Sequence, residues 1–198
     1  MPGRLPIKIT LRVLDLDLGI GARDLQLVRT MLDIPDTILQ KLAEDEQRNL
    51  AIVVKVEELV RRHTRIILFA ASVVHAQLLA VVLQARGIDA ATITGFTPSS
   101  KRVHLINEYK SDTDRPKVLC NYGVLTTGFD APRTSAALIA RPTKSLVLYS
   151  QMVGRAIRGP RVGGNHAAEI ITVIDRDLPG FGDVAQAFSN WEDVWRET

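Results

Sequence analysis

Between residues 65 and 175 the hydrophobic positions follow two alternating spacings. Short apolar runs, typical of buried strands, are separated by stretches whose apolar residues recur every three or four positions, as on one face of a helix. Strands alternating with helices are typical of a parallel sheet covered by helices on both faces, so the pattern predicts an α/β fold. The predicted strands lie at residues 66–70, 90–94, 117–121, 135–140 and 168–175.

Start and stop signals predict three helices between these strands. Gly87 follows the first helical stretch and can end it, whereas Thr97 and Ser145 can each cap the start of a later helix. Pro98 suits the first position of the second helix, because that position leaves its N–H unbonded in any case. The predicted helices span residues 73–86, 98–109 and about 146–158.

The two flanks have patterns of their own. In residues 1–64, apolar side chains alternate from Ile7 as in a strand, and a helical pattern rich in valine and glutamate covers 46–63. We expect this lead-in to pack on the main domain, residues 65–178. The tail, 179–198, suits an amphipathic helix that covers a sheet face or touches a neighbouring domain. Its apolar stripe is Val184, Ala187, Phe188, Trp191 and Trp195.

Composition narrows the class of protein. With 46% hydrophobic and 24% charged residues, the 198-residue chain has the balance of one globular domain with extra elements. No apolar run approaches the roughly 20 residues of a membrane span, and the N-terminus lacks the apolar stretch of a secretory signal. We therefore expect a soluble cytoplasmic protein with no membrane partner. Cys120, the only cysteine, lies in an apolar run that predicts a buried thiol.

The segment from Ser150 to Arg158 carries the most informative polar residues. On a helix, Gln151, Arg155 and Arg158 fall within about 60° of one another, so one face presents an amide and two guanidiniums. A guanidinium is a planar fork that stays charged, which suits it to the negative charge that develops in phosphoryl transfer. Gly154 is unfavourable inside a helix and indicates a close approach to the backbone. Taken alone, this segment is equally compatible with an exposed basic face.

A second polar segment follows the predicted strand at 117–121. Gly128 allows a tight turn, and Asp130 provides a carboxylate suited to a ribose hydroxyl, at a sheet edge where α/β proteins bind ligands. Thr126 and Thr127 offer hydroxyl and backbone N–H groups that can hold a nucleic-acid phosphate. The alternative is a plain loop with an aspartate cap and a proline stop.

Taken in order, these segments resemble a known family. TTGFDAP followed by QMVGRAIRGP resembles motifs V and VI of superfamily two helicases, and residues 68–76 resemble motif IV. The resemblance covers residues 65–175 and implies a RecA-like domain, a parallel sheet sandwiched by helices, which is the second of the two motor domains of an ATP-dependent helicase or translocase. Segments similar to the DEAD/DEAH-type branch of DNA translocases and restriction-enzyme motors are 141–143, 159–164 and Asp175.

The resemblance also implies roles for individual residues. Arg155 and Arg158 would be arginine fingers, and Gln151 would support the γ-phosphate region. Gly128 and Asp130 would contact the ribose side of ATP and couple it to the nucleic-acid track. A position after a strand or at a helix start favours phosphate for some of the track residues, although Arg102 can also be a plain solvated residue. The residues expected to face the nucleic-acid backbone are Thr94, Gly95, Arg102, Thr126 and Thr127.

The same interpretation defines what the chain lacks. No GxxxxGK[ST] occurs, so we expect the preceding RecA-like domain of a longer enzyme to hold ATP and its Mg²⁺, and this chain alone to be inactive. Residues 45–48 superficially resemble the DExx metal box, but helix-like residues precede them, so we interpret them as an acidic helix start. The four histidines lack metal-ligand spacing, and we expect helix-surface or loop roles for them and no metal site.

Two other functions compete with a motor domain. A non-catalytic nucleic-acid or protein-binding module with a helicase-like fold would show a degraded set of Gln151, Arg155 and Arg158, whereas the set is intact. A Rossmann-type nucleotide domain would need a glycine-rich turn after the first strand, where the sequence has no glycine. The formal charge of +3 permits a nucleic acid. The resemblance favours DNA over RNA, although phosphate contacts alone do not distinguish the two sugars.

Overall fold

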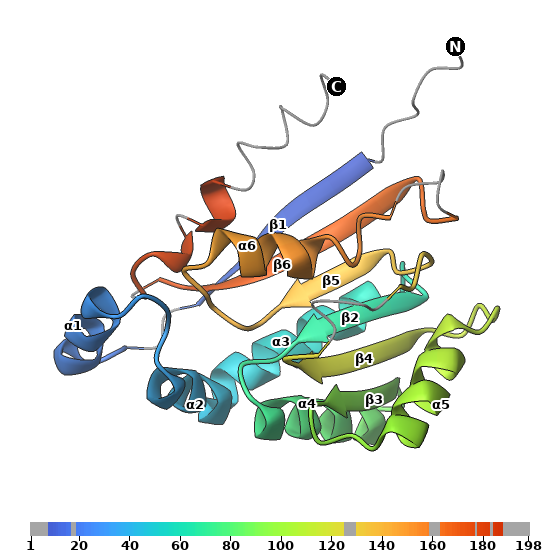
Figure 1. Cartoon of the computed structure of the whole chain (residues 1–198), viewed down its shortest axis with the longest axis horizontal. Helices are drawn as coiled ribbons and strands as arrows, with labels where there is room; N and C mark the ends of the chain where they lie inside the picture. The colour runs from blue at the N-terminus through green and yellow to red at the C-terminus, as the bar shows by residue number, and fades with distance from the viewer. Residues whose placement is uncertain are drawn as a thin grey trace, which may run out of the picture.

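The computed structural model describes residues 8–16, 19–124, 130–158, 163–176, 178–182 and 184–187. Its strands form one parallel sheet in the order β1-β6-β5-β2-β4-β3 (Figure 1), which confirms the predicted fold class. The strands are β1 (Lys8–Leu16), β2 (Arg65–Phe69), β3 (Asp89–Thr94), β4 (Lys117–Tyr122), β5 (Ala136–Ile139) and β6 (Ala167–Asp175). The helices are α1 (Ala22–Thr30), α2 (Asp36–Glu44), α3 (Glu46–Leu59), α4 (Val73–Ala85), α5 (Ser99–Lys110) and α6 (Leu146–Val153).

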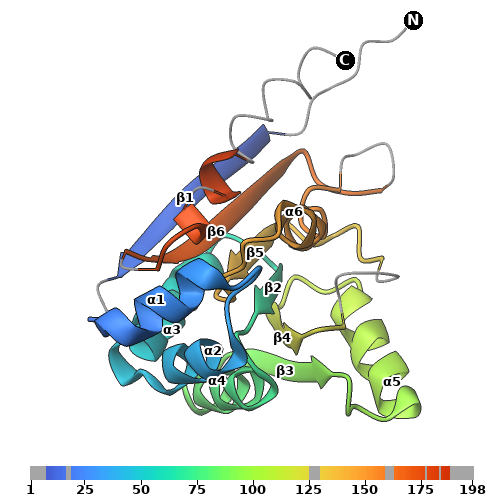
Figure 2. The same ribbon diagram turned by 60° about the vertical axis from the view of Figure 1, so that its left-hand side comes forward.

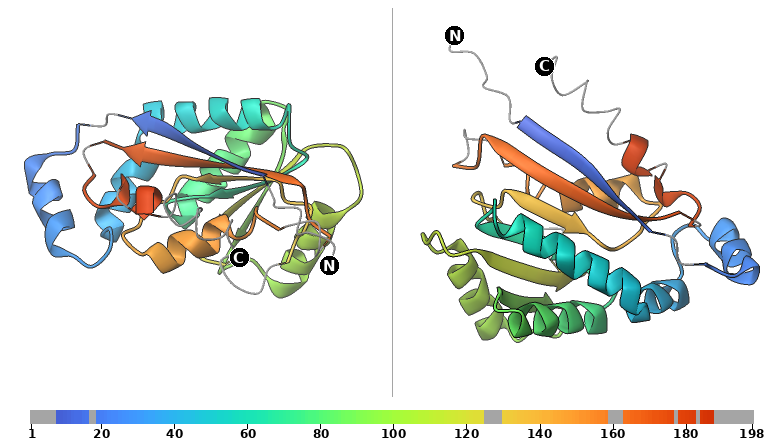
Figure 3. Two further views of the ribbon diagram at one scale, coloured as in Figure 1. Left: turned by 90° about the horizontal axis from the view of Figure 1, so that it is seen from above. Right: turned by 180° about the vertical axis from the view of Figure 1, so that it is seen from behind.

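Helices cover both faces of the sheet (Figure 2 and Figure 3). α3 and α4 pack on one face, where they meet alternate strand residues such as Ile66 and Leu68. α5 and α6 pack on the other face, against Ile67 and Phe69. Because successive side chains of a strand point to opposite faces, β2 divides its apolar residues between the two cores. A strand buried on both faces reads as a continuous apolar run, which is why the sequence pattern located β2.

Two described elements of the lead-in belong to this same sheet and core. β1 pairs with β6 along its whole length and forms an edge of the sheet. An ion pair of 2.9 Å between Arg12 Nε and Glu169 Oε1 joins the two strands. α3 buries Ile52, Val56 and Leu59 in the core that α4 also covers. The lead-in therefore adds an edge strand to the sheet and a helix to the layer that covers one of its faces.

The predicted helix starts and stops were partly correct. The helix predicted over 73–86 is α4, and Gly87 follows it with a positive φ of 79°. The cap predicted at Thr97 was wrong. Pro98 occupies the cap position of α5, and Thr97 Oγ1 instead accepts a hydrogen bond of 3.0 Å from Thr94 N. Thr97 therefore stabilises the turn before the helix rather than the helix itself.

A buried arginine joins α3 to the sheet. Arg48 Nε donates to Asp175 Oδ1 at 2.9 Å, and Arg48 Nη2 donates to Ala140 O at 2.7 Å. Asp45 caps α3, because its side chain accepts a hydrogen bond from Arg48 N. These contacts confirm that residues 45–48 are a helix start and explain why an arginine can be buried there.

The expectation of surface roles for the histidines was wrong at His75. Its ring is buried, Nδ1 accepts a hydrogen bond of 3.1 Å from Ala71 N, and Nε2 lies 2.9 Å from Asn49 Oδ1. Helical spacing puts His75 on the inward face of α4 with Leu79 and Leu83. Burial and the nearby Arg48 charge lower the pKa of His75 to about 3, so the ring is neutral.

The tail prediction lies only partly within the described residues. Phe181 and Val184 are buried in the core beneath α6, and the Phe181 ring meets Tyr149 edge-on with 6.2 Å between centroids. Ala187 is half-buried. The other residues of the predicted stripe, which lie outside the described residues, are Phe188, Trp191 and Trp195.

Cys120 is fully buried in β4, and burial raises the pKa of its thiol to about 12. The sequence prediction of a small buried hydrophobe is confirmed. Among the described helices, none has the length and apolar character needed to span a membrane.

Candidate functional site

α6 has one buried side and one side that faces solvent, as the apolar spacing predicts. Ser145 starts the helix, because its side chain accepts a hydrogen bond from a backbone N–H of the first turn. Tyr149, Met152 and Val153 are buried. The Tyr149 hydroxyl also shares a hydrogen bond of 2.7 Å with Thr172 Oγ1 on β6. The helix is therefore fixed to the sheet, and its other side is open to a ligand.

The prediction that this helix continues to Arg158 was wrong. α6 ends at Val153, and residues 154–156 form a turn in which Arg155 N and Ala156 N donate to carbonyls three residues earlier. Helical spacing therefore does not position Arg158. A Cβ atom on Gly154 would lie 3.1 Å from Ser150 O, so the close backbone approach expected there comes from the preceding helical turn.

The three predicted side chains nevertheless border one pocket on the solvent side of α6. The hollow measures about 450 Å³ and brings an amide and two guanidiniums together. Ser150 also lines it, but its hydroxyl donates to Leu146 O at 2.7 Å. The residues that line the pocket are Leu146, Val147, Ser150, Gln151, Gly154, Arg155 and Arg158. Most of the pocket surface is apolar, and the two guanidiniums and the amide are the groups in its lining that can bond an anion such as a phosphate.

Charges of both signs lie at the pocket. Arg158 Nη2 lies 3.5 Å from Asp130 Oδ1, and the two side chains are 34% and 67% exposed. Burial lowers the pKa of Arg155, the Arg158 charge lowers it further, and the Asp130 carboxylate raises it. The Arg155 guanidinium stays charged at neutral pH, because arginine side chains remain protonated in proteins. The pocket therefore holds two like charges beside one exposed carboxylate.

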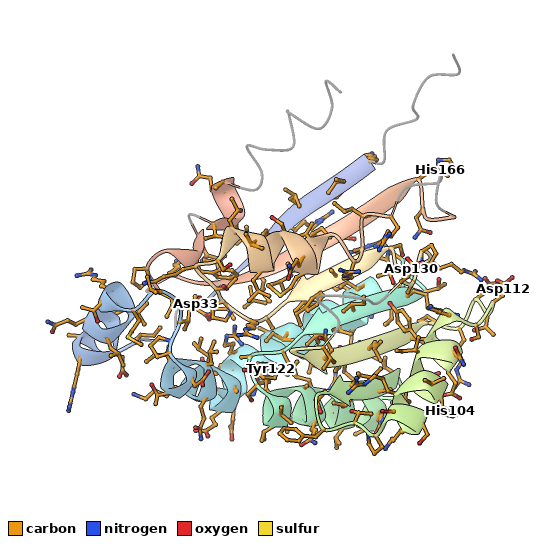
Figure 4. All side chains as sticks on the ribbon, in the orientation of Figure 1. Asp33, His104, Asp112, Tyr122, Asp130 and His166 are labelled. Carbon is orange, nitrogen blue, oxygen red and sulfur yellow. The ribbon has the colours of Figure 1, made fainter. Side chains whose placement is uncertain are left out.

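Asp130 lies apart from the carboxyl end of β4. Figure 4 shows it toward the end of the sheet where β5 begins, whereas Tyr122, the last residue of β4, lies toward the opposite end. Its carboxylate is exposed and within reach of Arg158, so it can serve a ribose hydroxyl beside the arginine pocket. The remaining candidates of this segment, which lie outside the described residues, are Thr126, Thr127 and Gly128.

The nucleic-acid candidates Thr94, Gly95 and Arg102 meet at the turn between β3 and α5. Thr94 is 3% exposed, whereas Gly95 is exposed. Arg102 Nη2 donates to the carbonyls of Thr94 at 3.2 Å, Thr97 at 3.3 Å and Gly95 at 3.5 Å. Arg102 thus holds the turn in shape and is not simply a solvated residue. None of the three lines the arginine pocket.

Sequence reasoning missed two features near the carboxyl ends of the strands. Phe96 lies in the same turn and is 85% exposed. Arg141 stacks over the Tyr122 ring with 4.9 Å between its Cζ and the ring centroid. The signal for Phe96 was present in the sequence, since an apolar ring stands between glycine and Thr-Pro in a turn. Arg141 and Tyr122 are brought together by β-sheet pairing, which no local pattern reveals.

The described residues contain no group of three or more histidine, cysteine, aspartate or glutamate side chains that could hold a metal ion. The charged groups in the lining of the pocket at α6 are the Arg155 and Arg158 guanidiniums, which can bond an anion.

The parallel six-stranded sheet with helices on both faces is the RecA-like fold of helicase C-terminal domains. The chain matches the helicase conserved C-terminal domain over residues 47–160, more than half of its length, and belongs to that family.

Two sequence relatives share a 92-residue region with this chain. The "51.5 kDa protein" of Lactococcus phage (isolate 7-9) is 39% identical over that region, which is 46% of this chain and 20% of the phage protein. The "Putative ATP-dependent helicase IRC3" of Saccharomyces cerevisiae is 35% identical, over 46% of this chain and 13% of the yeast protein. The match thus spans a fifth or less of either relative.

Solved structures share the fold at low sequence identity. The C-terminal domain of the DEAD-box protein Dbp5 is 17% identical with a TM-score of 0.60, covering 92% of this chain and 85% of that one. Mycobacterium smegmatis helicase Lhr, bound to ssDNA and AMP-PNP, is 19% identical with a TM-score of 0.63, covering 93% of this chain and 22% of Lhr. Domain 2 of Mss116p, bound to an RNA duplex, is 17% identical with a TM-score of 0.60, covering 92% and 60%.

Proposed function

We propose that this chain is the second motor domain of an ATP-dependent nucleic-acid helicase or translocase, and that Arg155 and Arg158 complete an ATP site formed with a preceding RecA-like domain of the same polypeptide. The observation that carries the proposal is the pocket on α6, which gathers Gln151 and both guanidiniums around about 450 Å³ of open space. In that arrangement the guanidiniums stabilise charge that develops on the transferred phosphoryl group.

The pocket geometry supports a role for each side chain. Arg155 is partly buried beside α6 and is therefore restricted in direction, which suits a fixed phosphate contact. Arg158 can exchange its ion-pair partner more easily, because its described ion pair is with an exposed carboxylate. In our proposal, an incoming phosphate group takes the place of Asp130 as the partner of Arg158. Asp130 is then released toward the ribose, the side of ATP to which we also assign Gly128.

ATP supplies the phosphoryl group, and its Mg²⁺ would be held by the preceding domain. The described residues fit the anion, since their donors are two guanidiniums and an amide, but they include no metal-binding cluster. We therefore propose that the chain alone does not hydrolyse ATP. Closure of the two motor domains would bring the arginines to a nucleotide already bound by the preceding domain.

We further propose that the nucleic acid runs over the turn between β3 and α5. Gly95 is exposed there and can approach a phosphate closely, while Arg102 keeps the turn in shape. Thr126 and Thr127 would contribute further phosphate contacts. DNA is the proposed nucleic acid, in keeping with the resemblance to DNA translocases and with the ssDNA bound by Lhr. RNA, which is bound by Mss116p, is the alternative that binding assays must separate.

The proposal is tested by the ATPase activity of a longer protein that contains the preceding domain, with and without DNA or RNA. We expect stimulation by nucleic acid, no activity in the 198-residue chain, and a large loss in Arg155→Ala. Arg29→Ala, at an exposed position of α1, is the matched control. A longer protein that hydrolyses ATP equally well with Arg155→Ala would exclude the finger role and favour a binding module with a helicase-like fold.

A further inference from the structure

Phe96 is presented to solvent by the turn that follows β3. Its ring is 85% exposed, and it is the only exposed aromatic side chain among the described residues. The other described aromatic rings are buried or half-buried, such as Phe69, Tyr109 and Phe181 in the core and Tyr122 at its margin. At this exposure the ring buries little apolar area on folding, so packing within the chain does not explain its position.

The turn that carries Phe96 is rigidly built. Phe96 N donates to Thr94 Oγ1 at 3.3 Å, and Thr97 N donates to Thr94 O at 3.1 Å. Thr97 Oγ1 accepts from Thr94 N, and Arg102 adds bonds to three carbonyls of the same turn. A backbone with so many hydrogen bonds has few accessible conformations. The turn itself therefore fixes the ring in its exposed position.

The surroundings of the ring fit a nucleotide better than a protein. Residues 94–107 contain no aspartate or glutamate and include the cationic Lys101 and Arg102, whereas His104 lies 3.5 Å from Glu108 Oε2. The adjacent Ser99 and Lys101 are exposed. A single ring offers at most about 200 Å² of contact, far below the roughly 800 Å² per partner of a stable protein interface. One flat base, with its phosphate beside the cationic residues, matches both the area and the charge.

We propose that Phe96 is a stacking platform for an unpaired nucleobase. The inference rests on the nucleic-acid track proposed above and adds a contact of a different kind, since the other track residues hold phosphates. Stacking requires a base face that is free of its neighbour, so the subsite favours single-stranded nucleic acid over a duplex. Because every base has a stacking face, it accepts any sequence.

The test separates base contacts from phosphate contacts. The 198-residue chain is titrated at low ionic strength into a fluorescent oligothymidine and into an abasic strand of the same length and charge, and anisotropy reports binding. We expect Phe96→Ala to weaken binding to oligothymidine by about 5- to 150-fold, the range for loss of one stacked base, and to leave abasic binding within about twofold. Phe96→Trp should retain the preference for bases, and Phe96→Leu should lose it.

Each outcome has a definite meaning. Equal losses on both strands, or no loss on either, would overturn the stacking subsite while leaving the nucleic-acid track in place. Failure of the unmodified chain to bind either strand would overturn the proposed track and the subsite together. Unchanged thermal unfolding of Phe96→Ala and Phe96→Leu checks that the fold is preserved, as expected for an exposed side chain.

Discussion

Two arginine–aspartate pairs show how differently this fold uses the same chemistry. Arg48 and Asp175 are 0% and 1% exposed, and they meet at 2.9 Å between α3 and the end of β6. Arg158 and Asp130 are 34% and 67% exposed, and they meet at 3.5 Å beside an open pocket. The first pair has no room for another partner, whereas the second can exchange its carboxylate for a ligand. Burial, rather than residue type, therefore separates a structural arginine from a candidate functional one.

The buried pair is held at a cost. Burial raises the pKa of Asp175, although the Arg48 charge and its hydrogen bond act in the opposite direction. Desolvation therefore outweighs the attraction of the guanidinium at this carboxylate. Such a pair fixes the position of α3 against the sheet, and losing one member leaves an uncompensated charge in the core.

The largest expected effect is on catalysis at the exposed pair. In the longer protein, Arg158→Ala should lower the ATP hydrolysis rate by about 10³-fold or more, the range for loss of an arginine finger. The free energy of unfolding of the chain should change by less than about 1 kcal/mol, because the side chain is partly exposed. Single-turnover hydrolysis and urea unfolding measure the two effects. A normal rate would remove Arg158 from the proposed ATP site.

The next effect is on stability at the buried pair. Arg48→Ala should destabilise the chain by about 3–5 kcal/mol, because Asp175 and Ala140 O lose their donor in the core. The double variant Arg48→Met with Asp175→Leu should recover most of this loss, because no unpaired charge remains. Urea unfolding of all three proteins measures the difference. A single variant as stable as the unmodified chain would contradict the account of the pair.

A smaller expected effect is the dependence of folding stability on pH through His75. The folded-state pKa of His75 is about 3, below its usual 6.5, so the unfolded chain takes up the proton first as pH falls. Stability is therefore complete above about pH 6.5 and declines between 6.5 and 3, with about 2 kcal/mol lost to this group at pH 5. Urea unfolding at pH 7 and pH 5 measures the loss. His75→Gln, which cannot titrate, should show a flatter pH dependence, and an identical slope would refute the assignment.

The smallest effect is at Asp130. Asp130→Asn removes the partner of Arg158 but should change the free energy of unfolding by no more than about 1 kcal/mol, as is usual for exposed ion pairs. The affinity of the longer protein for ATP should fall if the carboxylate meets the ribose as proposed. Comparing ATP with its 2′-deoxy analogue identifies this contact, because the variant should no longer distinguish them. Continued discrimination between the two nucleotides would place the ribose elsewhere.

Local patterns predicted most of the fold. β2, β4 and β6 were located because each is a short apolar run, and Gly87 was correctly assigned as a helix stop. α1 was not predicted, since Val28 is its only buried residue and it carries little apolar signal. The early end of α6 was missed because Gly154 was placed inside the helix.

Tertiary contacts were beyond the reach of local patterns. In the sequence, Arg48 lies in the segment that superficially resembles a metal box, and Asp175 is one of the residues that resemble the helicase family. Because 127 positions separate them, no local pattern predicts that they form an ion pair. The sequence predicted a surface position for His75, whereas in the structure α4 directs its ring toward Asn49. At the candidate site, the grouping of Gln151, Arg155 and Arg158 was predicted from helix geometry, yet a turn rather than a helix brings Arg158 to the pocket.

The pairing of β1 with β6 has a consequence for synthesis of the chain. β1 leaves the ribosome long before β6, its neighbour in the sheet of the described residues, has been made, so the backbone N–H and C=O groups that pair with β6 stay unpaired until then. Contacts of such long sequence separation form late and slow the completion of folding. Lys8, Arg12 and Asp15 are distributed along the waiting strand, and their charges oppose its pairing with another nascent chain. The same strand that completes the sheet therefore carries its own protection against aggregation during translation.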